Sequence, residues 1–321
     1  MKDYHIPVLL NECIDGLDIK SDGTYVDATF GGGGHSREII KKIETGRLFG
    51  VDQDEDARVN AEGFEDRIFT FIDSNFRHLS KFLRLEGIEK IDGLLVDLGV
   101  SSHQIDEPER GFSTRFDAIL DMRMNKNQGL TAEKIINTYP REDLQKVLGK
   151  YGEIRNARTL AENIIRARIE APVRTTGELI SILKRFVPAK RQNKYYAQVF
   201  QALRIEVNDE LGALQDLLRQ SADLIKSGGR LVTIAYHSLE DRLIKNYINT
   251  GNFEGREVKD IYGYSIRPFR AMTRKPIVAP EQEVLKNNRA RSARLRIAEK
   301  RLQRYPAGFM GIRRNIWLLL V

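Results

Sequence analysis

The residues whose types best suit chemistry begin with four consecutive glycines, Gly31–Gly34. They follow a predicted strand over residues 24–30, which is rich in β-branched and aromatic side chains, and precede a predicted helix whose N-cap is expected at Ser36. Glycine lets the backbone approach a ligand closely, and a helix start presents unpaired N–H groups. The stretch therefore predicts an anion- or nucleotide-binding turn, and a plain flexible loop is the alternative.

Two carboxylates close later strands. Asp52 follows the glycines at roughly the 20-residue offset of an acid that binds ribose hydroxyls. Asp97 ends a nearly continuous apolar run, and Ser101 and Ser102 follow it in the loop that would face a reacting group. Because the carboxyl ends of parallel strands meet at one edge of a sheet, we expect these residues to gather there. A solvated turn for Asp52 and a buried salt bridge for Asp97 are the alternatives.

The spacing of the glycines argues against a dinucleotide. The fingerprint G-x-G-x-x-G fails, because its last position falls on Ser36 when it starts at Gly31 and on Arg37 when it starts at Gly32. S-adenosylmethionine needs a tight glycine turn near its amino-acid end, an acid for the ribose and an apolar contact for adenine. The residues that supply these features are Gly33, Gly34, Asp52 and Phe76. Ordinary core packing is the alternative for Phe76.

These residues need a scaffold of alternating strands and helices. Strands are predicted over residues 24–30, 47–52, 67–73, 92–99, 230–237, 267–273 and 294–298. The first four alternate with helices, which is typical of a doubly wound α/β fold. From about residue 107 to residue 204 only helices are predicted, one of them opened by a capping box of Thr175 and Glu178. A long helix with a break near Asn208 leads back to the sheet.

The same pattern predicts the domain organisation. Residues 1–106 and 205–301 are expected to form the ligand-binding domain, and residues 107–204 a helical substrate-recognition domain inserted after the fourth strand. Residues 302–321 form a tail of unknown structure.

The composition disfavours several classes of protein. The chain has 321 residues, of which 41% are hydrophobic and 30% charged, the balance of a globular protein. No run of about 18 apolar residues could span a membrane, and the N-terminus lacks the apolar core of a signal peptide. Cys13 is the only cysteine, so no disulfide can form within the chain, and we expect a cytoplasmic location.

The charge distribution favours a polyanionic partner. The formal net charge is +7, and the basic residues gather near the C-terminus. The two clusters are Arg267, Arg270, Arg274 and Lys275, and then Lys286, Arg289, Arg291, Arg294, Arg296, Lys300, Arg301 and Arg304. Two clusters of one sign favour nucleic acid, and a solvated edge strand and tail are the alternative.

Other constellations carry less chemistry. His237 and Ser238 with Asp241 could suggest a hydrolase, but no G-x-S-x-G elbow exists, and Ser238 with Asp241 predicts helix capping instead. The five histidines and Cys13 show no metal-ligand spacing, so no metal site is predicted.

Several blocks of the chain resemble the RsmH (MraW) family of bacterial small-subunit ribosomal RNA cytosine-N4 methyltransferases. The blocks are Val26–Ser36, Asp97–Ser102, Glu109–Ser113, Leu120–Met124, Phe200–Ile205, His237–Arg242 and Asn288–Ser292. The resemblance covers about residues 4–300 in the same order. Ile119, where the family usually has proline, and the run Tyr195–Gln198 depart from the family pattern.

The resemblance implies a class I methyltransferase (Rossmann-like) fold, S-adenosylmethionine as methyl donor and a cytidine in the decoding region of 16S ribosomal RNA as acceptor. The donor-binding residues that it implies are Gly33, Gly34, His35, Asp52, Phe76, Asp97 and Gln104. The oligomeric state stays open between monomer and homodimer.

The expected mechanism is an in-line transfer to an exocyclic amine, whose lone pair is delocalised into the base. Asp97 and the loop of Ser101 and Ser102 are our candidates to accept a hydrogen bond from that amine. The base has to swing out of its stack to reach them. Two rivals are a non-catalytic RNA-binding or ribosome-assembly factor with this fold, and a small-molecule methyltransferase or dehydrogenase, which would not need the basic clusters.

Overall fold

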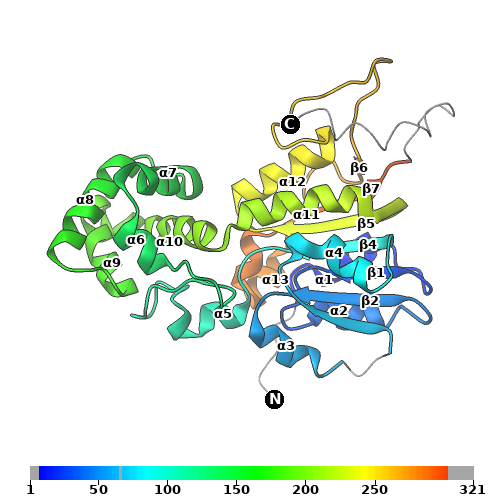
Figure 1. The fold of residues 1–321 in the computed structure, drawn as a ribbon, viewed down its shortest axis with the longest axis horizontal. Coiled ribbons are helices and arrows are strands. Elements are labelled where there is room, and N and C mark those ends of the chain that lie inside the picture. The colour runs from blue at the N-terminus through cyan, green and yellow to red at the C-terminus, as the bar shows by residue number, and fades with distance from the viewer. Residues whose placement is uncertain (1–6, 65–66, 303–321) are drawn as a thin grey trace.

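Seven strands form one sheet in the order β3-β2-β1-β4-β5-β7-β6 (Figure 1). The computed structural model describes residues 7–64 and 67–302. The strands are β1 Thr24–Asp27, β2 Arg47–Asp52, β3 Phe69–Asp73, β4 Ile91–Asp97, β5 Ile225–Ala235, β6 Phe269–Ala271 and β7 Arg294–Lys300. The strands β1 to β5 are parallel to one another, and β7 runs antiparallel to both β5 and β6. The order reverses between β1 and β4, where folds of this type bind ligands.

Helices cover both faces of the sheet because successive strand side chains point to opposite sides. In β4, Leu94 belongs to the core under α4, α11 and α12, whereas its neighbour Leu95 belongs to the core under α1 and α2. These helices are α1 Leu10–Leu17, α2 Gly34–Ile40, α4 Leu79–Leu85, α11 Glu210–Leu224 and α12 Ser238–Thr250. Three further helices are α3 Glu55–Ala61, α5 Ser102–Asp106 and α13 Glu281–Lys286.

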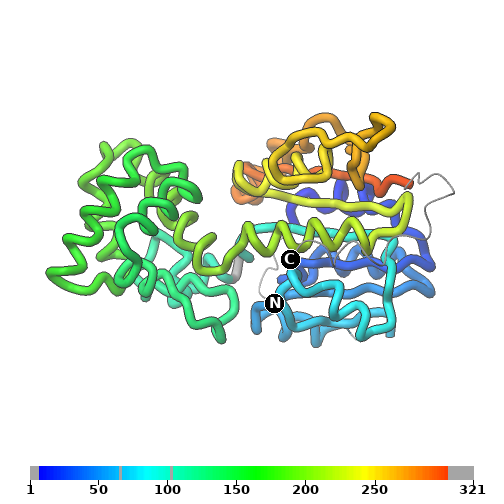
Figure 2. Tube along the Cα trace, turned by 45° about the horizontal axis from the view of Figure 1, so that its top comes forward, coloured from blue at the N-terminus to red at the C-terminus, as the bar shows by residue number. Residues whose placement is uncertain are grey.

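Between α5 and α11 the chain leaves the sheet and forms a helical lobe. Its helices are α6 Ala132–Thr138, α7 Arg141–Gly152, α8 Ala157–Glu170, α9 Thr176–Leu183 and α10 Gln192–Asn208. They bury a core of their own, which includes Ile135, Leu148, Leu160 and Val199, all fully buried. Figure 2 shows the lobe to one side of the sheet, with α10 leading toward α11. A doubly wound α/β sheet with a helical insertion after the fourth strand is therefore confirmed.

Several element boundaries also agree with the sequence. Thr175 and Glu178 form the expected capping box at the start of α9. The expected break near Asn208 is present, because Asp209 adopts a left-handed conformation (φ 46°) between α10 and α11. The proposed domain boundary at 204/205 lies inside the last turn of α10.

Two predicted helix caps were wrong. The helix after the glycines begins at Gly34 with Gly33 as its N-cap, and the Ser36 hydroxyl is buried and donates to Asp27 instead. At α12 the N-cap is His237, whose imidazole accepts from the Glu240 amide while the Glu240 side chain accepts from the His237 amide. A side chain that meets a partner from another element is not available for capping.

The strand boundaries differ as well. The first strand ends at Asp27 rather than at residue 30, because the backbone then turns into the glycine loop. The fifth strand begins at Ile225 rather than at residue 230. The residues around Gly228 (φ 80°) were expected to end the preceding helix, but they belong to this strand, whose pairing with β4 has an irregularity. The third and sixth strands begin later than predicted, at Phe69 and Phe269. None of the helices in the described ranges has the length and apolarity needed to cross a bilayer.

Candidate functional site

The glycine turn joins the end of β1 to α2. Gly31 (φ 51°) and Gly33 (φ 72°) both adopt left-handed conformations that favour glycine. The Gly33 amide donates to the Phe30 carbonyl at 2.7 Å, which closes the turn. A Cβ atom on Gly33 would lie 2.7 Å from the Phe64 ring, so the turn has no room for another residue there. The expected turn is therefore present, and its backbone lies at the carboxyl edge of the sheet.

Asp52 lies at the end of β2, where the sequence placed it. One of its carboxylate oxygens accepts from the Gly31 amide at 2.8 Å and the other from the Asp54 amide at 3.0 Å. Burial raises the pKa of Asp52 to about 6, although these two hydrogen bonds oppose the rise. The structure therefore brings this carboxylate to the glycine turn.

Asp97 ends β4, next to β1. Its amide donates to the Thr29 hydroxyl at 2.7 Å, and its Oδ1 accepts from the Tyr236 hydroxyl at 2.8 Å. Burial raises the pKa of Asp97 to about 6, and the nearby His35 ring and the hydrogen bond from Tyr236 oppose the rise. Tyr236 lies just past β5, and the sequence offered no signal for its contact with Asp97.

A third carboxylate, Asp27, was not singled out from the sequence. It is 1% exposed at the end of β1, where its oxygens accept from the Ser36 hydroxyl at 2.8 Å and the Thr29 amide at 3.2 Å. Burial raises its pKa to about 6. An acid four residues before the first glycine, within the predicted strand, is the signal that could have identified it.

The three carboxylates share one electrostatic property. Asp27, Asp52 and Asp97 end the adjacent strands β1, β2 and β4, and in the described ranges of the chain no lysine or arginine forms an ion pair with any of them. Asp27 is buried and the other two are partly buried, and a carboxylate removed from water without a cationic partner raises the free energy of the ligand-free protein. The edge therefore suits a ligand that carries positive charge, and the ammonium and sulfonium groups of S-adenosylmethionine meet that requirement.

His35 and Phe76 also lie at this edge of the sheet. His35 is 6% exposed in the first turn of α2, and its Nε2 lies 3.2 Å from the Val8 carbonyl. Burial lowers the pKa of His35, which favours the neutral imidazole at pH 7. Phe76 begins a 3₁₀ turn after β3 and packs half-buried against the sheet core.

Ser101 and Gln104 form a reciprocal cap at the start of α5. The Ser101 hydroxyl accepts from the Gln104 amide at 3.1 Å, and the Gln104 side-chain oxygen accepts from the Ser101 amide at 3.0 Å. The Gln104 side chain also donates to Asp54. Ser102 begins α5, and its side chain lies outside what the structure describes.

A buried ion pair joins this region to the lobe, and the sequence did not predict it. Arg110, 8% exposed, pairs with Asp54 at 3.0 Å and with Asp56 at 3.1 Å. Its guanidinium also donates to the carbonyls of Arg123 and Met124 at 2.9 and 3.0 Å. Burial by itself would raise the pKa of Asp54, but the hydrogen bonds from Arg110 and Gln104 hold it below its ordinary value.

One group of side chains in the described part of the chain has ligand atoms close enough for a metal. Atoms of Glu210, His237 and Glu240 lie within 4.8 Å of one another. However, Arg204 donates to both oxygens of Glu210 at 2.8 and 2.9 Å, and Glu240 caps α12. Since an arginine already neutralises one carboxylate, we interpret the group as an ion-pair network at the junction of α10, α11 and α12.

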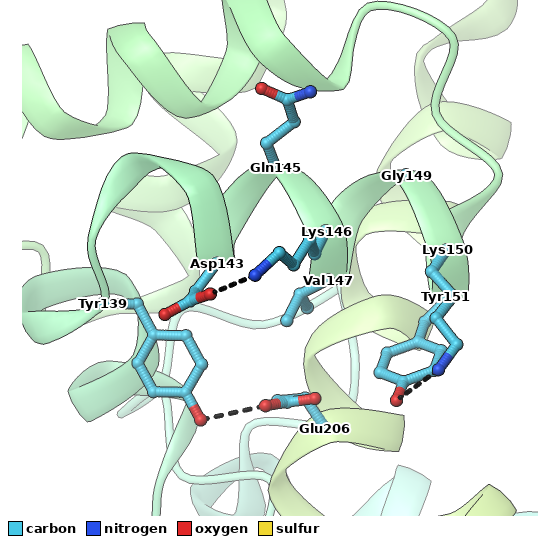
Figure 3. A pocket seen from close by; sticks show the side chains of 9 residues that line it. All are labelled: Tyr139, Asp143, Gln145, Lys146, Val147, Gly149, Lys150, Tyr151 and Glu206. Atoms are coloured by element: carbon cyan, nitrogen blue, oxygen red, sulfur yellow. Dashed lines mark hydrogen bonds and ion pairs between the residues drawn. The ribbon is translucent and has the colours of Figure 1, made fainter.

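A cavity of about 530 Å³ lies within the helical lobe, away from the carboxyl edge of the sheet (Figure 3). Tyr139 and Tyr151 lie on either side of Glu206, which accepts from the Tyr139 hydroxyl at 2.9 Å. Lys146 pairs with Asp143 at 3.0 Å, and the Lys150 ammonium lies over the Tyr151 ring. The cavity of the lobe is therefore lined by both aromatic and charged side chains.

Comparisons with known proteins agree with these observations. The family described as the MraW methylase family matches residues 2–301. The ribosomal RNA small subunit methyltransferase H of Cytophaga hutchinsonii is 56% identical over 297 residues, which cover 92% of this chain and 99% of that protein. The protein of the same name from Flavobacterium johnsoniae is 54% identical over 299 residues, covering 93% and 98%.

An rRNA methylase from Streptococcus thermophilus of known structure aligns over 93% of this chain and 100% of its own at 11% identity, with a TM-score of 0.42. With the sheet order and the family match together, the doubly wound class I methyltransferase (Rossmann-like) fold is confirmed. The chain belongs to the MraW methylase family.

Proposed function

We propose that the protein transfers the methyl group of S-adenosylmethionine to N4 of a cytidine in the decoding region of 16S ribosomal RNA. Its family is a methyltransferase family, and its relatives are named for the RNA of the small ribosomal subunit. The observation that carries the proposal is the edge of three carboxylates around a glycine turn, of which Asp27 is buried and Asp52 and Asp97 are partly buried, with no lysine or arginine of the described chain paired to them. This chemistry suits a cationic methyl donor.

The residues proposed to hold the donor lie around that edge. They are Gly33, Gly34, His35, Asp52, Phe76, Asp97 and Gln104. Asp52 would accept from the ribose hydroxyls, and the turn at Gly33 and Gly34 would surround the methionine end. When bound, the donor supplies a methyl group that its sulfonium already activates. The protein then mainly aligns the acceptor nitrogen with that group.

Asp97 is our first candidate to position the acceptor amine. Tyr236 occupies its Oδ1, which leaves Oδ2 to accept a hydrogen bond from the amine. Its pKa of about 6 keeps the carboxylate charged at pH 7 and able to receive a proton afterwards. Ser101 and Ser102 remain candidates on the neighbouring loop. If Asp97 instead binds the donor's ammonium, these two residues are left to contact the amine.

We assign substrate recognition to the helical lobe, residues 107–204, and to the basic residues near the C-terminus. The substrate is the 16S RNA of the small subunit, so the reaction belongs to the cytoplasm. The target base has to leave its stack to reach Asp97. Phosphate contacts make binding weaken as the salt concentration rises.

The test uses the purified full chain with labelled donor and small subunits that lack the modification. The expected result is methyl transfer, with mass mapping that places one new methyl group on a cytidine N4 in the decoding region. Absence of transfer, with RNA binding retained, would instead support a non-catalytic assembly factor. Transfer to small molecules without RNA binding would support the second rival.

A further inference from the structure

A second cavity lies on the α12 face of the sheet, at its antiparallel edge. It has a volume of about 240 Å³ and opens between α12 and the strands β6 and β7. The polar residues that line it are Lys245, Asn249, Thr273, Arg274 and Arg296. Three of these five side chains are cationic, so the cavity favours an anion.

Only part of that positive charge is neutralised. Arg296 donates to both oxygens of Asp241 at 2.7 and 3.1 Å, and Arg294 approaches the same carboxylate at 3.3 Å. Lys245 and Arg274 are exposed, and among the residues that the structure describes neither forms an ion pair. Two free cations beside an amide and a hydroxyl are the side chains that bind a phosphate group of a nucleic acid backbone.

A short hairpin rises beside this cavity. The Ile266 amide donates to the Val258 carbonyl at 2.8 Å, and the Asp260 carboxylate accepts from the amides of Tyr262 and Tyr264 at 2.9 Å each. These bonds order the tip, yet Tyr262 is 66% and Tyr264 is 71% exposed. Exposed aromatic rings on an ordered turn offer stacking surfaces for unpaired bases.

The hairpin and the cavity are joined at the end of α12. Gly251 (φ 74°) ends this helix so close to the hairpin that a Cβ atom there would lie 2.6 Å from the Ile266 carbonyl oxygen. The Arg267 guanidinium reaches the carbonyl of Asn249, which lines the cavity, at 3.5 Å. Figure 1 shows the segment between α12 and β6 projecting beyond the sheet.

We propose that this cavity and hairpin form an accessory RNA-binding surface. The cavity takes a backbone phosphate, and Tyr262 and Tyr264 stack on an unpaired base of the same strand. The inference rests on the proposed function, in which ribosomal RNA is the substrate. Since β6 lies three strand spacings from β4, about 14 Å to the side, the surface binds nucleotides outside the catalytic edge.

The test compares three double variants of the full chain. K245A/R274A removes the free cations and Y262A/Y264A removes the stacking rings. K81A/R84A removes two exposed cations of α4 that form no ion pair in the described structure, and serves as the matched control. Each is assayed for methyl transfer to unmodified small subunits, for binding to protein-free 16S RNA at several salt concentrations, and for donor affinity by calorimetry.

Both test variants should raise the KM for small subunits and weaken RNA binding by about tenfold, with kcat and donor affinity unchanged. K245A/R274A should also reduce the slope of log affinity against log salt by about 1, whereas Y262A/Y264A should leave that slope unchanged. The control should match the unaltered protein in every measurement.

Test variants that behave like K81A/R84A would overturn the proposal. Full affinity for protein-free RNA with a loss only on assembled subunits would assign the surface to a ribosomal protein, and would overturn it too. A parent protein that methylates no ribosomal RNA would refute the proposed function. The RNA-binding comparison would still test the accessory surface in that case.

Discussion

Asp27, Asp52 and Asp97 show how burial changes the chemistry of single residues. Each has a pKa of about 6 in the folded protein, above the ordinary value of 3.8, because burial disfavours the charged form. A raised acid pKa means that the ligand-free protein loses stability as the pH rises through 6. A cationic ligand stabilises the charged carboxylates, so the ligand-bound protein loses less stability than the ligand-free protein as the pH rises.

Donor affinity should therefore depend on pH. We expect it to rise from pH 5 to pH 7, by up to about tenfold per pH unit for each carboxylate that must ionise. Calorimetry in buffers of different ionisation enthalpy should also show protons released on binding near pH 5.5. The variant D97N should flatten the profile, and an affinity that does not change with pH would contradict a role for these carboxylates.

Asp52 provides a more local prediction. D52N keeps an acceptor for the Gly31 amide but removes the charge, and we expect donor affinity to fall by about tenfold or more, since hydrogen bonds to charged groups contribute about 1.5–3 kcal/mol. D73N is the control, because Asp73 pairs with Asp52 in the sheet register and is exposed. Equal affinities for the two variants in calorimetry would refute the ribose assignment.

At the scale of elements, a buried ion pair holds the start of the lobe against α3. Asp54 caps α3 by accepting from the Asp56 amide, and Arg110 binds the same carboxylate from the 3₁₀ turn Pro108–Arg110. Because Arg110 also donates to two carbonyls of the lobe entrance, one side chain joins three segments. Its removal would leave Asp54 buried and unpaired.

R110M should lower the free energy of unfolding by about 3 kcal/mol in urea titrations at pH 7. The matched change R115M, at an exposed arginine, should alter it by no more than about 0.5 kcal/mol. The pKa of Asp54 is lowered, so the pair contributes above the ordinary carboxyl pKa, and its contribution is lost as the pH falls through the lowered value. The difference between R110M and the parent should therefore shrink in acid, and a constant difference would argue against the ion pair.

At the scale of the whole molecule, the sheet and the lobe bury separate cores. Leu94 lies in the sheet core and Leu148 in the lobe core, and both are fully buried. The lobe leaves after β4 and returns through α10, and the network of Arg204, Glu210 and Glu240 lies where it rejoins the sheet. This arrangement separates the proposed donor site from the proposed substrate-recognition domain.

Leucine-to-alanine changes in the two cores should therefore have different effects. Each should cost about 2–5 kcal/mol of local stability. L148A should speed amide hydrogen exchange in α7, α8 and α10 and raise the KM for small subunits, while donor affinity stays unchanged. L94A should speed exchange in the sheet and weaken donor binding. Equal acceleration in both parts by either variant would show that they unfold as one unit.

Sequence patterns alone were enough to predict the scaffold and much of the site. The alternation of apolar strands with helices predicted the doubly wound sheet and the helical insertion, because both depend on local periodicity. The rule that parallel strands end at one edge then placed Asp52 and Asp97 beside the glycine turn. The failed dinucleotide spacing, with Asp52 and Phe76, favoured S-adenosylmethionine as the ligand, and the family resemblance added ribosomal RNA as the expected methyl acceptor.

Only the tertiary structure decided which groups those residues meet. Asp97 contacts Tyr236 across 139 positions of sequence, and Arg110 meets Asp54 across 56. The same cause explains the errors at Ser36 and Ser238, whose hydroxyls donate to Asp27 and Glu153, partners that the local pattern does not show. Local periodicity determines where a helix or strand forms, but the burial of a polar side chain and its partner depend on how distant elements pack. The glycine turn, Asp52 and Asp97 could thus be predicted from the sequence, whereas the burial of Asp27 and the hydrogen-bond partners of all three carboxylates were decided only when the chain folded.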